Sequence, residues 1–162
     1  MTCSELTACT LRVQVNLDGY ALPIKKLKGT EPVESLDLSN KRLGVASAIV
    51  IASLIGVNGA LTVTNLLRNQ FDAESAKMLA EVAKQKGVSL CGIQRDKTVA
   101  DFSGHALKPP DAILLASDLS QAVVTGSLTK IDVSWNIFGP EGAKVFADAL
   151  CANSALRQVL AF

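Results

Sequence analysis

The sequence predicts an α/β fold, a short solenoid with parallel strands on a concave face, helices on a convex face and an N-terminal β-hairpin cap. Short stretches of alternating apolar and polar residues are each followed by a turn and a helical pattern. Residues 36–71 also align with residues 100–138 with one gap, and identities fall at apolar, turn and helix positions alike. A 162-residue chain of this kind is predicted to be a short array of stacked repeats.

The sequence divides into a tail, a cap and the repeat array. Residues 1–10 carry no pattern, and we expect them to be flexible. Residues 11–32 are predicted to form the β-hairpin cap, because alternating stretches on both sides of Asp18-Gly19 flank a tight turn signal. The repeats then run over 33–162, with an internal duplication of 36–99 and 100–162.

Within the repeats, strand and helix signals alternate. Helices are predicted over 45–55, 73–86, 110–122 and from Gly139-Pro140 onward, since proline suits a first helical position. Strand signals precede them near 35–38, 61–65, 90–93 and 128–133, and a last one covers 155–162. The spacing slips over 94–109, where we expect an enlarged loop with an extended piece at 100–103.

Composition excludes several function classes. Hydrophobic residues make up 49% of the chain and aromatic residues only 4%, so the core must consist of Leu, Val, Ile and Ala. The net charge is +1, and the only basic cluster, Lys25, Lys26 and Lys28, is interpreted as a solvated surface, so no nucleic acid partner is expected. The longest apolar run, at 45–57, is below the roughly 20 residues that span a bilayer, so no membrane insertion is predicted.

The four cysteines and the single histidine suggest no metal site and no cofactor. None of the cysteines stands in a C-x-x-C pair, so reduced thiols are the simplest interpretation. The N-terminus lacks the basic and apolar blocks of a signal peptide. We therefore expect a cytoplasmic location or another reducing compartment.

The stretch from Ser127 to Ala149 reads SLTKIDVSWNIFGPEGAKVFADA, a strand, an asparagine, a turn and a helix. It resembles one leucine-rich repeat, with the pattern L-x-x-L-x-L-x-x-N-x-L, and its turn and long helix are similar to the ribonuclease-inhibitor-like subclass. The resemblance implies that Asn69 and Asn136 form a structural ladder, with amides turned inward to bind backbone groups. Lys41 and His105 stand at the equivalent position of the two irregular units.

The same resemblance implies a protein-binding module, an adaptor or an accessory subunit of a larger assembly, rather than an enzyme. Strand positions on the concave face would contact a partner, with Arg68 and Trp135 as anchors, because Arg and Trp are enriched at interface hot spots. Trp135 has a second interpretation, packing over its own loop. The predicted contact residues are Asp37, Ser39, Asn65, Leu67, Arg68, Gln94, Lys130, Asp132, Ser134 and Trp135.

The apolar C-terminal edge, Val159, Leu160 and Phe162, is expected to be covered by another protein or a second copy of the chain. The partner would be another protein, a large multi-subunit complex or a homodimer. One alternative is a regulator of a small GTPase, since the Ran GTPase-activating family resembles this repeat type. A less favoured alternative is a hydrolase or transferase that uses Cys91 or His105, for which the spacing gives no support.

Overall fold

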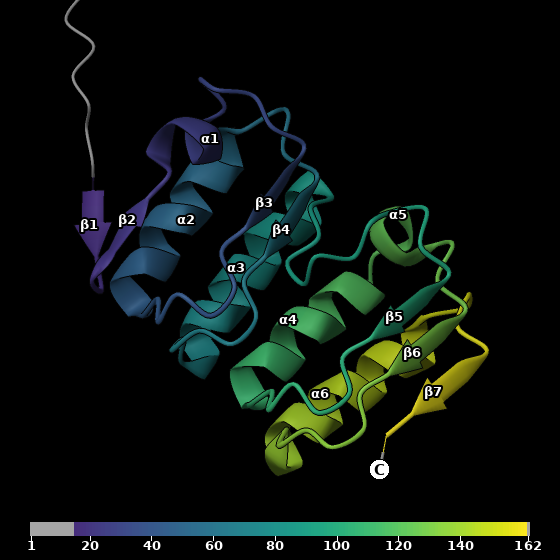
Figure 1. The fold of residues 1–162 in the computed structure, drawn as a ribbon. Coiled ribbons are helices and arrows are strands. Elements are labelled where there is room, and N and C mark those ends of the chain that lie inside the picture. The colour runs from purple at the N-terminus through teal and green to yellow at the C-terminus, as the bar shows by residue number, and fades with distance from the viewer. Residues whose placement is uncertain (1–14, 162) are drawn as a thin grey trace, which may run out of the picture.

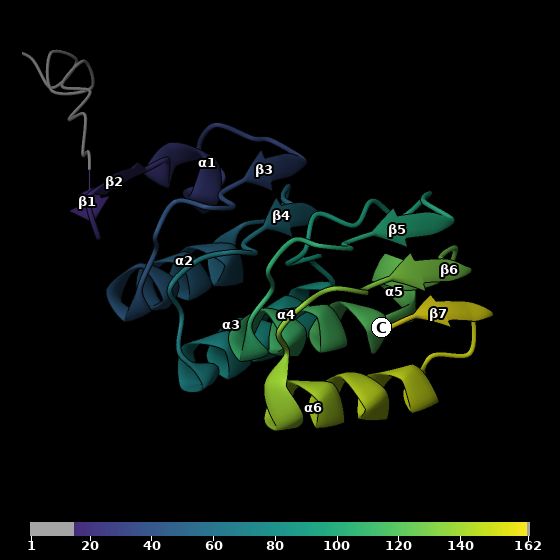
Figure 2. The same ribbon diagram turned by 60° about the horizontal axis from the view of Figure 1, so that its bottom comes forward.

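The computed structural model describes residues 15–161, which form a layer of helices beneath a layer of short strands (Figures 1 and 2). The layer consists of α2 (Val45–Val57), α3 (Ala73–Lys86), α4 (Pro109–Leu119) and α6 (Gly139–Ala152). Each packs against the next in this order, α2 on α3, α3 on α4 and α4 on α6. The chain is therefore α/β.

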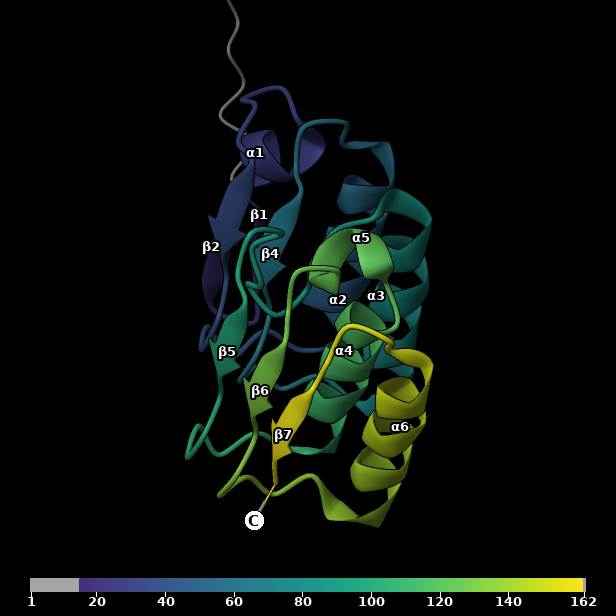
Figure 3. The same ribbon diagram turned by 90° about the vertical axis from the view of Figure 1, so that its right-hand side faces the viewer.

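The strands are three residues long and pair mostly in parallel. β3 (Ser35–Asp37) pairs with β4 (Val63–Asn65). β6 (Lys130–Asp132) pairs with β5 (Val99–Asp101) on one side and with β7 (Gln158–Leu160) on the other. Figure 3 shows both sets of strands on the same side of the helices. Parallel strands with a helix between them explain why strand and helix signals alternate along the sequence.

The prediction of a solenoid is wrong. The described strands fall into separate sheets of two, two and three strands, so no single concave sheet runs through the molecule. The break comes after the segment expected as a strand at 90–93. This segment bonds to β4 and the residue that follows it, for example from the Leu66 N–H to the Leu90 carbonyl at 2.8 Å, and forms isolated bridges of Val63 with Ser89 and Asn65 with Cys91. It does not pair with β5. The solenoid and repeat descriptions of the fold are corrected on this ground to an α/β fold with small sheets.

The side chain of Asp118, in α4, gives a physical reason for the break. Its carboxylate accepts the backbone N–H groups of Leu90 at 2.9 Å and Cys91 at 3.0 Å. Backbone donors that point at a carboxylate are not available to a neighbouring strand. Gly92 follows with a φ of 78°, a left-handed conformation that turns the chain away from an extended path.

The N-terminal part holds a hairpin and a short helix. β1 (Val15–Leu17) and β2 (Tyr20–Leu22) pair antiparallel in a sheet of their own. The second alternating stretch ends at Leu22, because α1 (Ile24–Lys28) begins directly after Pro23. The expected tail at 1–10, the start of the first predicted strand and the C-terminal Phe162 lie outside the described residues.

Two other elements differ from their predicted bounds. The helix expected over 110–122 is divided into α4 and a short α5 (Ala122–Thr125), since Gln121 leaves the helical conformation. The extended piece expected at 100–103 is β5, at Val99–Asp101, and it pairs with β6. The helix predicted over 73–86 has the same bounds in the structure, where Asp72 accepts a hydrogen bond from the backbone of Ser75 at 2.7 Å.

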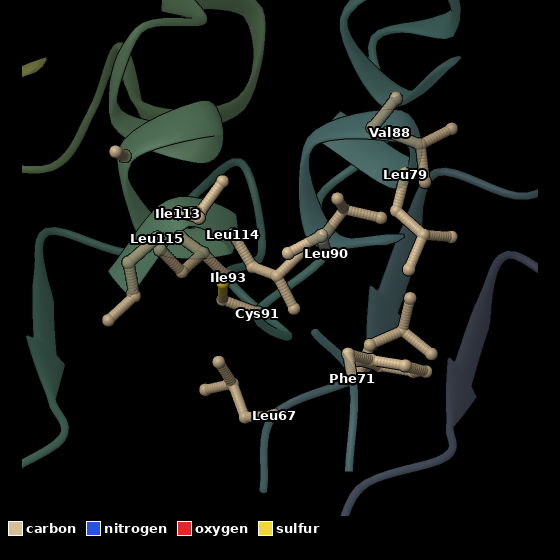
Figure 4. Close-up of a cluster of buried hydrophobic side chains, with 14 of the residues drawn as sticks. Leu67, Phe71, Leu79, Val88, Leu90, Cys91, Ile93, Ile113, Leu114 and Leu115 are labelled. Atoms are coloured by element: carbon tan, nitrogen blue, oxygen red, sulfur yellow. The ribbon is translucent and has the colours of Figure 1, made fainter. Parts of the chain in front are cut away.

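The core lies between the strands and the helices. Figure 4 shows the cluster beneath the break, where Leu90 and Cys91 meet Leu114 and Leu115 from α4. The residues that directly follow β3, β4, β5 and β6 are also buried; they are Leu38, Leu66, Phe102 and Val133. Leu, Ile, Val and Ala make up most of this core, and Phe71, Phe102, Phe146 and Cys91 complete it.

Candidate protein-binding surface

Asn69 fixes the loop that follows β4. Its Oδ1 accepts the backbone N–H groups of Lys41 at 3.0 Å and Leu43 at 3.1 Å. Its Nδ2 donates to the carbonyls of Leu38 at 2.9 Å and Leu66 at 2.8 Å. One buried amide thereby satisfies four backbone groups and joins the loops after β3 and β4.

Asn136 has the matching role in the loop that follows β6. Its Oδ1 accepts the backbone N–H of Leu107 at 2.9 Å. Its Nδ2 donates to the carbonyls of Phe102 at 2.8 Å and Val133 at 2.9 Å. Because the amide is held at both ends, the residue just before it has little freedom. That residue is Trp135.

Trp135 is held in an unfavourable backbone conformation and points into solvent. Its φ is 60°, in the left-handed region that costs an L-residue roughly 1–2 kcal/mol. Its side chain is 79% exposed, and Ile137, two residues further on, is also strongly exposed. The loop thus presents two large apolar side chains that contribute little to the core.

An apolar groove of about 410 Å³ lies beside Trp135. Its walls are Trp135 and Phe138 from the loop, Phe146 and Leu150 from α6, and Ala161 after β7. Among the described helices, α6 packs extensively against α4 alone, which leaves its other side free to line the groove. We call Trp135, Ile137 and this groove the Trp135 surface.

The residues predicted as partner contacts are divided between separate sheets, although these sheets lie on the same side of the helices. Some lie on β3, β4 and their loops, and the others lie on β6 and β7, across the break between the sheets. Only Trp135 and its immediate neighbours adjoin the groove. Exposed are Asp37, Arg68, Gln94 and Trp135, and half-buried are Ser39, Asn65, Lys130, Asp132, Ser134, Val159 and Leu160.

Leu67 is a correction among these residues. Its side chain is only 3% exposed, so it belongs to the core and is not available to a partner. Figure 4 places Leu67 in the cluster that also contains Cys91 and Leu115. The same core cluster contains Leu90 and Ile93 from the segment after α3.

The row of aspartates at the strand ends has a local structural role. Asp37, Asp101 and Asp132 each accept the backbone N–H of the serine two residues later, at 2.9–3.0 Å. The hydroxyl of Ser103 also donates to Asp101 and, as the largest contribution, lowers the pKa of that carboxyl. These side chains close tight turns after the strands.

Cys91 and His105, the residues of the hydrolase or transferase alternative, lie in different surroundings. The Cys91 side chain is buried, and burial raises the pKa of its thiol well above the usual value, which disfavours the reactive thiolate. His105 is exposed, with its ring edge-on to Phe102 at 6.2 Å between centroids. Within residues 15–161, no group of three or more His, Cys, Asp or Glu side chains is placed to hold a metal ion.

Sequence reasoning missed two buried carboxylates in α4. Asp118 accepts the hydroxyl of Ser89 at 2.7 Å in addition to two backbone N–H groups, and its burial raises its pKa to about 6. Asp111 accepts the backbone N–H groups of Arg68 at 2.8 Å and Lys108 at 2.9 Å, and burial raises its pKa too. Two aspartates seven residues apart in an otherwise apolar helix were the available signal.

No family model matches the chain, and its resemblance to the leucine-rich repeat family stays a prediction. Among solved structures, the chain is similar to one described as "Leiomodin-1 Actin-Binding Site 2 (ABS2)", with a TM-score of 0.52 and 14% sequence identity. The match covers 86% of this chain and 77% of that one. At this identity the likeness concerns the fold alone. None of the helices described in this chain is long and apolar enough to cross a membrane.

Proposed function

We propose that this chain binds another protein and that the Trp135 surface is the contact. The exposure of Trp135 carries the proposal. A tryptophan that is 79% exposed contributes little to the core, and its left-handed backbone costs stability. Strained residues persist mainly where function requires them, and tryptophan is the residue type most enriched at interface hot spots.

The groove beside Trp135 supports this proposal. A partner side chain of the size of Leu or Phe would meet Phe146 and Leu150 on α6 and lose its contact with water. Ile137, two residues further along the loop, would add exposed apolar surface. An aromatic anchor beside an apolar groove is the arrangement expected of an interface centre.

The structural neighbour's title suggests one concrete partner to test. That protein is described as an actin-binding site, so actin is the first candidate for this chain, although the neighbour's contacts are not transferred to particular residues. Co-sedimentation with filamentous actin and a binding titration with monomeric actin test it directly. Failure of both would remove actin but not the proposed surface.

Affinity capture from the native source tests the surface itself. We expect Trp135→Ala to lose at least one partner that the wild-type chain retains. The matched control is Val123→Ala, which truncates an exposed apolar side chain on α5 and should retain every partner. Identical partner sets for the wild-type chain and Trp135→Ala would contradict the proposal.

A further inference from the structure

Helix α2 has a second uncovered apolar face, away from the Trp135 surface. The helix contains no charged residue over its full length. Ile49 is 50% exposed and Val57 is 68% exposed, and Val45 is exposed on the same side. The spacing of these three residues by multiples of four places them along one side of the helix. Helices that are apolar all round are normally buried.

The aligned face of helix α4 shows how such a face is covered when a helix has a neighbour on each side. Ile49 and Ser53 of α2 align with Ile113 and Ser117 of α4. Ile113 is only 8% exposed and Ser117 is buried, because α4 lies between α3 and α6. Ser53 is exposed, whereas Ser117 is buried. The hydroxyl of Ser117 donates to the carbonyl of Ala80 in α3 at 3.4 Å.

Among residues 15–161, the corresponding side of α2 has no such neighbour. The hydroxyl of Ser53 is exposed and bonds within its own helix, to the carbonyl of Ile49 at 2.9 Å. α3 packs along one side of α2, but of the described elements only the five-residue α1 and the hairpin meet the other side (Figure 1). The position that a full helix occupies beside α4 is therefore only partly filled beside α2.

A basic cluster borders the uncovered face. Asn58, directly after Val57, donates from Nδ2 to the carbonyls of Lys26 and Leu27 at 2.9 Å, which fixes α1 at the C-terminal end of α2. The last turn of α1 carries Lys25, Lys26 and Lys28. The face is therefore apolar along its length and positively charged at one end.

We propose that the outer face of α2 binds an amphipathic helix of a partner protein. The partner helix would place small or branched apolar side chains against Ile49 and Val57, as α3 does against α4. Acidic residues at one end would lie near Lys25 and Lys28. A membrane surface is disfavoured, because helices that lie on membranes use Trp, Phe and Leu, and the exposed face of α2 offers Val and Ile. The proposal is independent of the function assigned to the Trp135 surface.

The test uses two synthetic helices of about 18 residues, long enough at roughly 1.5 Å per residue to span α2. Both carry a stripe of Val and Ala, and one is flanked by Glu and the other by Lys. Fluorescence anisotropy of each labelled peptide is measured against the full chain. We expect the Glu peptide to bind about tenfold or more tightly than the Lys peptide, which corresponds to about 1.4 kcal/mol.

Variants locate the contact. Ile49→Asp and Val57→Asp should each weaken binding of the Glu peptide about tenfold or more, and both sites are exposed enough to leave the fold intact by circular dichroism. The pair Lys25→Glu and Lys28→Glu should reverse the preference between the peptides. Val123→Asp, an exposed valine on α5, is the control and should change nothing.

Four outcomes would overturn the proposal. One is equal binding of both peptides by all variants. A second is binding to phosphatidylserine vesicles without binding to either peptide, which would assign the face to a membrane. A third is a dimer in light scattering that Ile49→Asp abolishes, which would assign it to a second copy. The last is peptide binding that requires deletion of residues 2–14, which would assign it to the chain's own N-terminal segment.

Discussion

Helices α2 and α4 align in sequence but have opposite surroundings. In α4 every residue from Asp111 to Leu119 is buried, whereas α2 leaves one side open to solvent. Leu54 in α2 aligns with Asp118 in α4, and the carboxylate of Asp118 holds the segment that joins the two halves. The repeated sequence pattern thus specifies a helix in both halves. The elements that pack around each helix determine which polar side chains it needs.

The loops after the strands differ less between the halves. Aligned residues share left-handed backbones at three places, so the chain follows the same local path in both. What differs is the residue type at these places, Asn and two Arg in the first half against Gly, Ala and Trp in the second. The pairs are Asn40 (φ 56°) with Gly104 (63°), Arg42 (59°) with Ala106 (54°), and Arg68 (62°) with Trp135 (60°).

The largest expected difference between the two helices lies at Asp118. Asp118→Leu installs the residue that α2 carries at the aligned position, and it leaves the hydroxyl of Ser89 and two backbone N–H groups without an acceptor. We expect a loss of about 4 kcal/mol in the free energy of unfolding by urea denaturation. The leucine would be tolerated only if the segment after α3 were free to turn outward.

The control on the same helix is Ser117→Ala. Ser117 is equally buried, but its hydroxyl makes one long hydrogen bond of 3.4 Å. We expect a loss of about 0.5 kcal/mol. Similar losses for Ser117→Ala and Asp118→Leu would show that burial, and not the hydrogen bonds of Asp118, sets the cost.

The two loop asparagines extend the comparison between the two halves of the chain. Asn69→Ala leaves four backbone groups unpaired in a buried loop, and we expect it to cost about 3 kcal/mol. Asn136 is only half-buried, so water can replace part of its bonding, and Asn136→Ala should cost about 1.5 kcal/mol. Urea denaturation of both variants measures the difference. Equal losses in the free energy of unfolding would mean that the exposure of the loop does not affect the cost of removing the asparagine.

The sequence was sufficient for local structure wherever residue type and geometry are tied directly. Asp72 and Gly87 mark both ends of α3, and the structure has a side-chain cap and a left-handed C-cap at those residues. The wrong prediction was the continuous sheet. It failed because the backbone of Leu90 and Cys91 bonds to a side chain 27 or 28 residues later, and strand patterns report nothing about such distant acceptors.

The candidate site was also only partly predictable. Trp135 was singled out as a lone tryptophan before the asparagine, but its 79% exposure depends on the left-handed backbone. Leu67 was placed outward because alternation assumes an open sheet, whereas its side chain lies in the core. The face of α2 could not be inferred, because an apolar helix pattern gives no sign of a missing neighbour.

Asp118 should also make the free energy of unfolding depend on pH, an effect to which the aligned Leu54 of α2 cannot contribute. The pKa of Asp118 is about 6 in the folded chain against an ordinary value of 3.8, so the folded state binds the proton more tightly. The free energy of unfolding should therefore rise by about 2 kcal/mol as the pH falls from about 7 to about 4.5. Asp118→Asn should flatten this part of the profile. Asp101, with its lowered pKa, acts in the opposite direction mainly below this window.

The smallest expected change in stability separates the two interpretations of Trp135. Trp135→Gly and Arg68→Gly both relieve a left-handed backbone, and glycine's greater freedom in the unfolded chain offsets part of that gain. We expect both variants to be about 0.5 kcal/mol more stable than the wild-type chain, as measured by urea denaturation. Only Trp135→Gly should also lose a captured partner. A loss of stability at position 135 but not at 68 would mean that the indole packs over its own loop, and its exposure would then no longer argue for an interface.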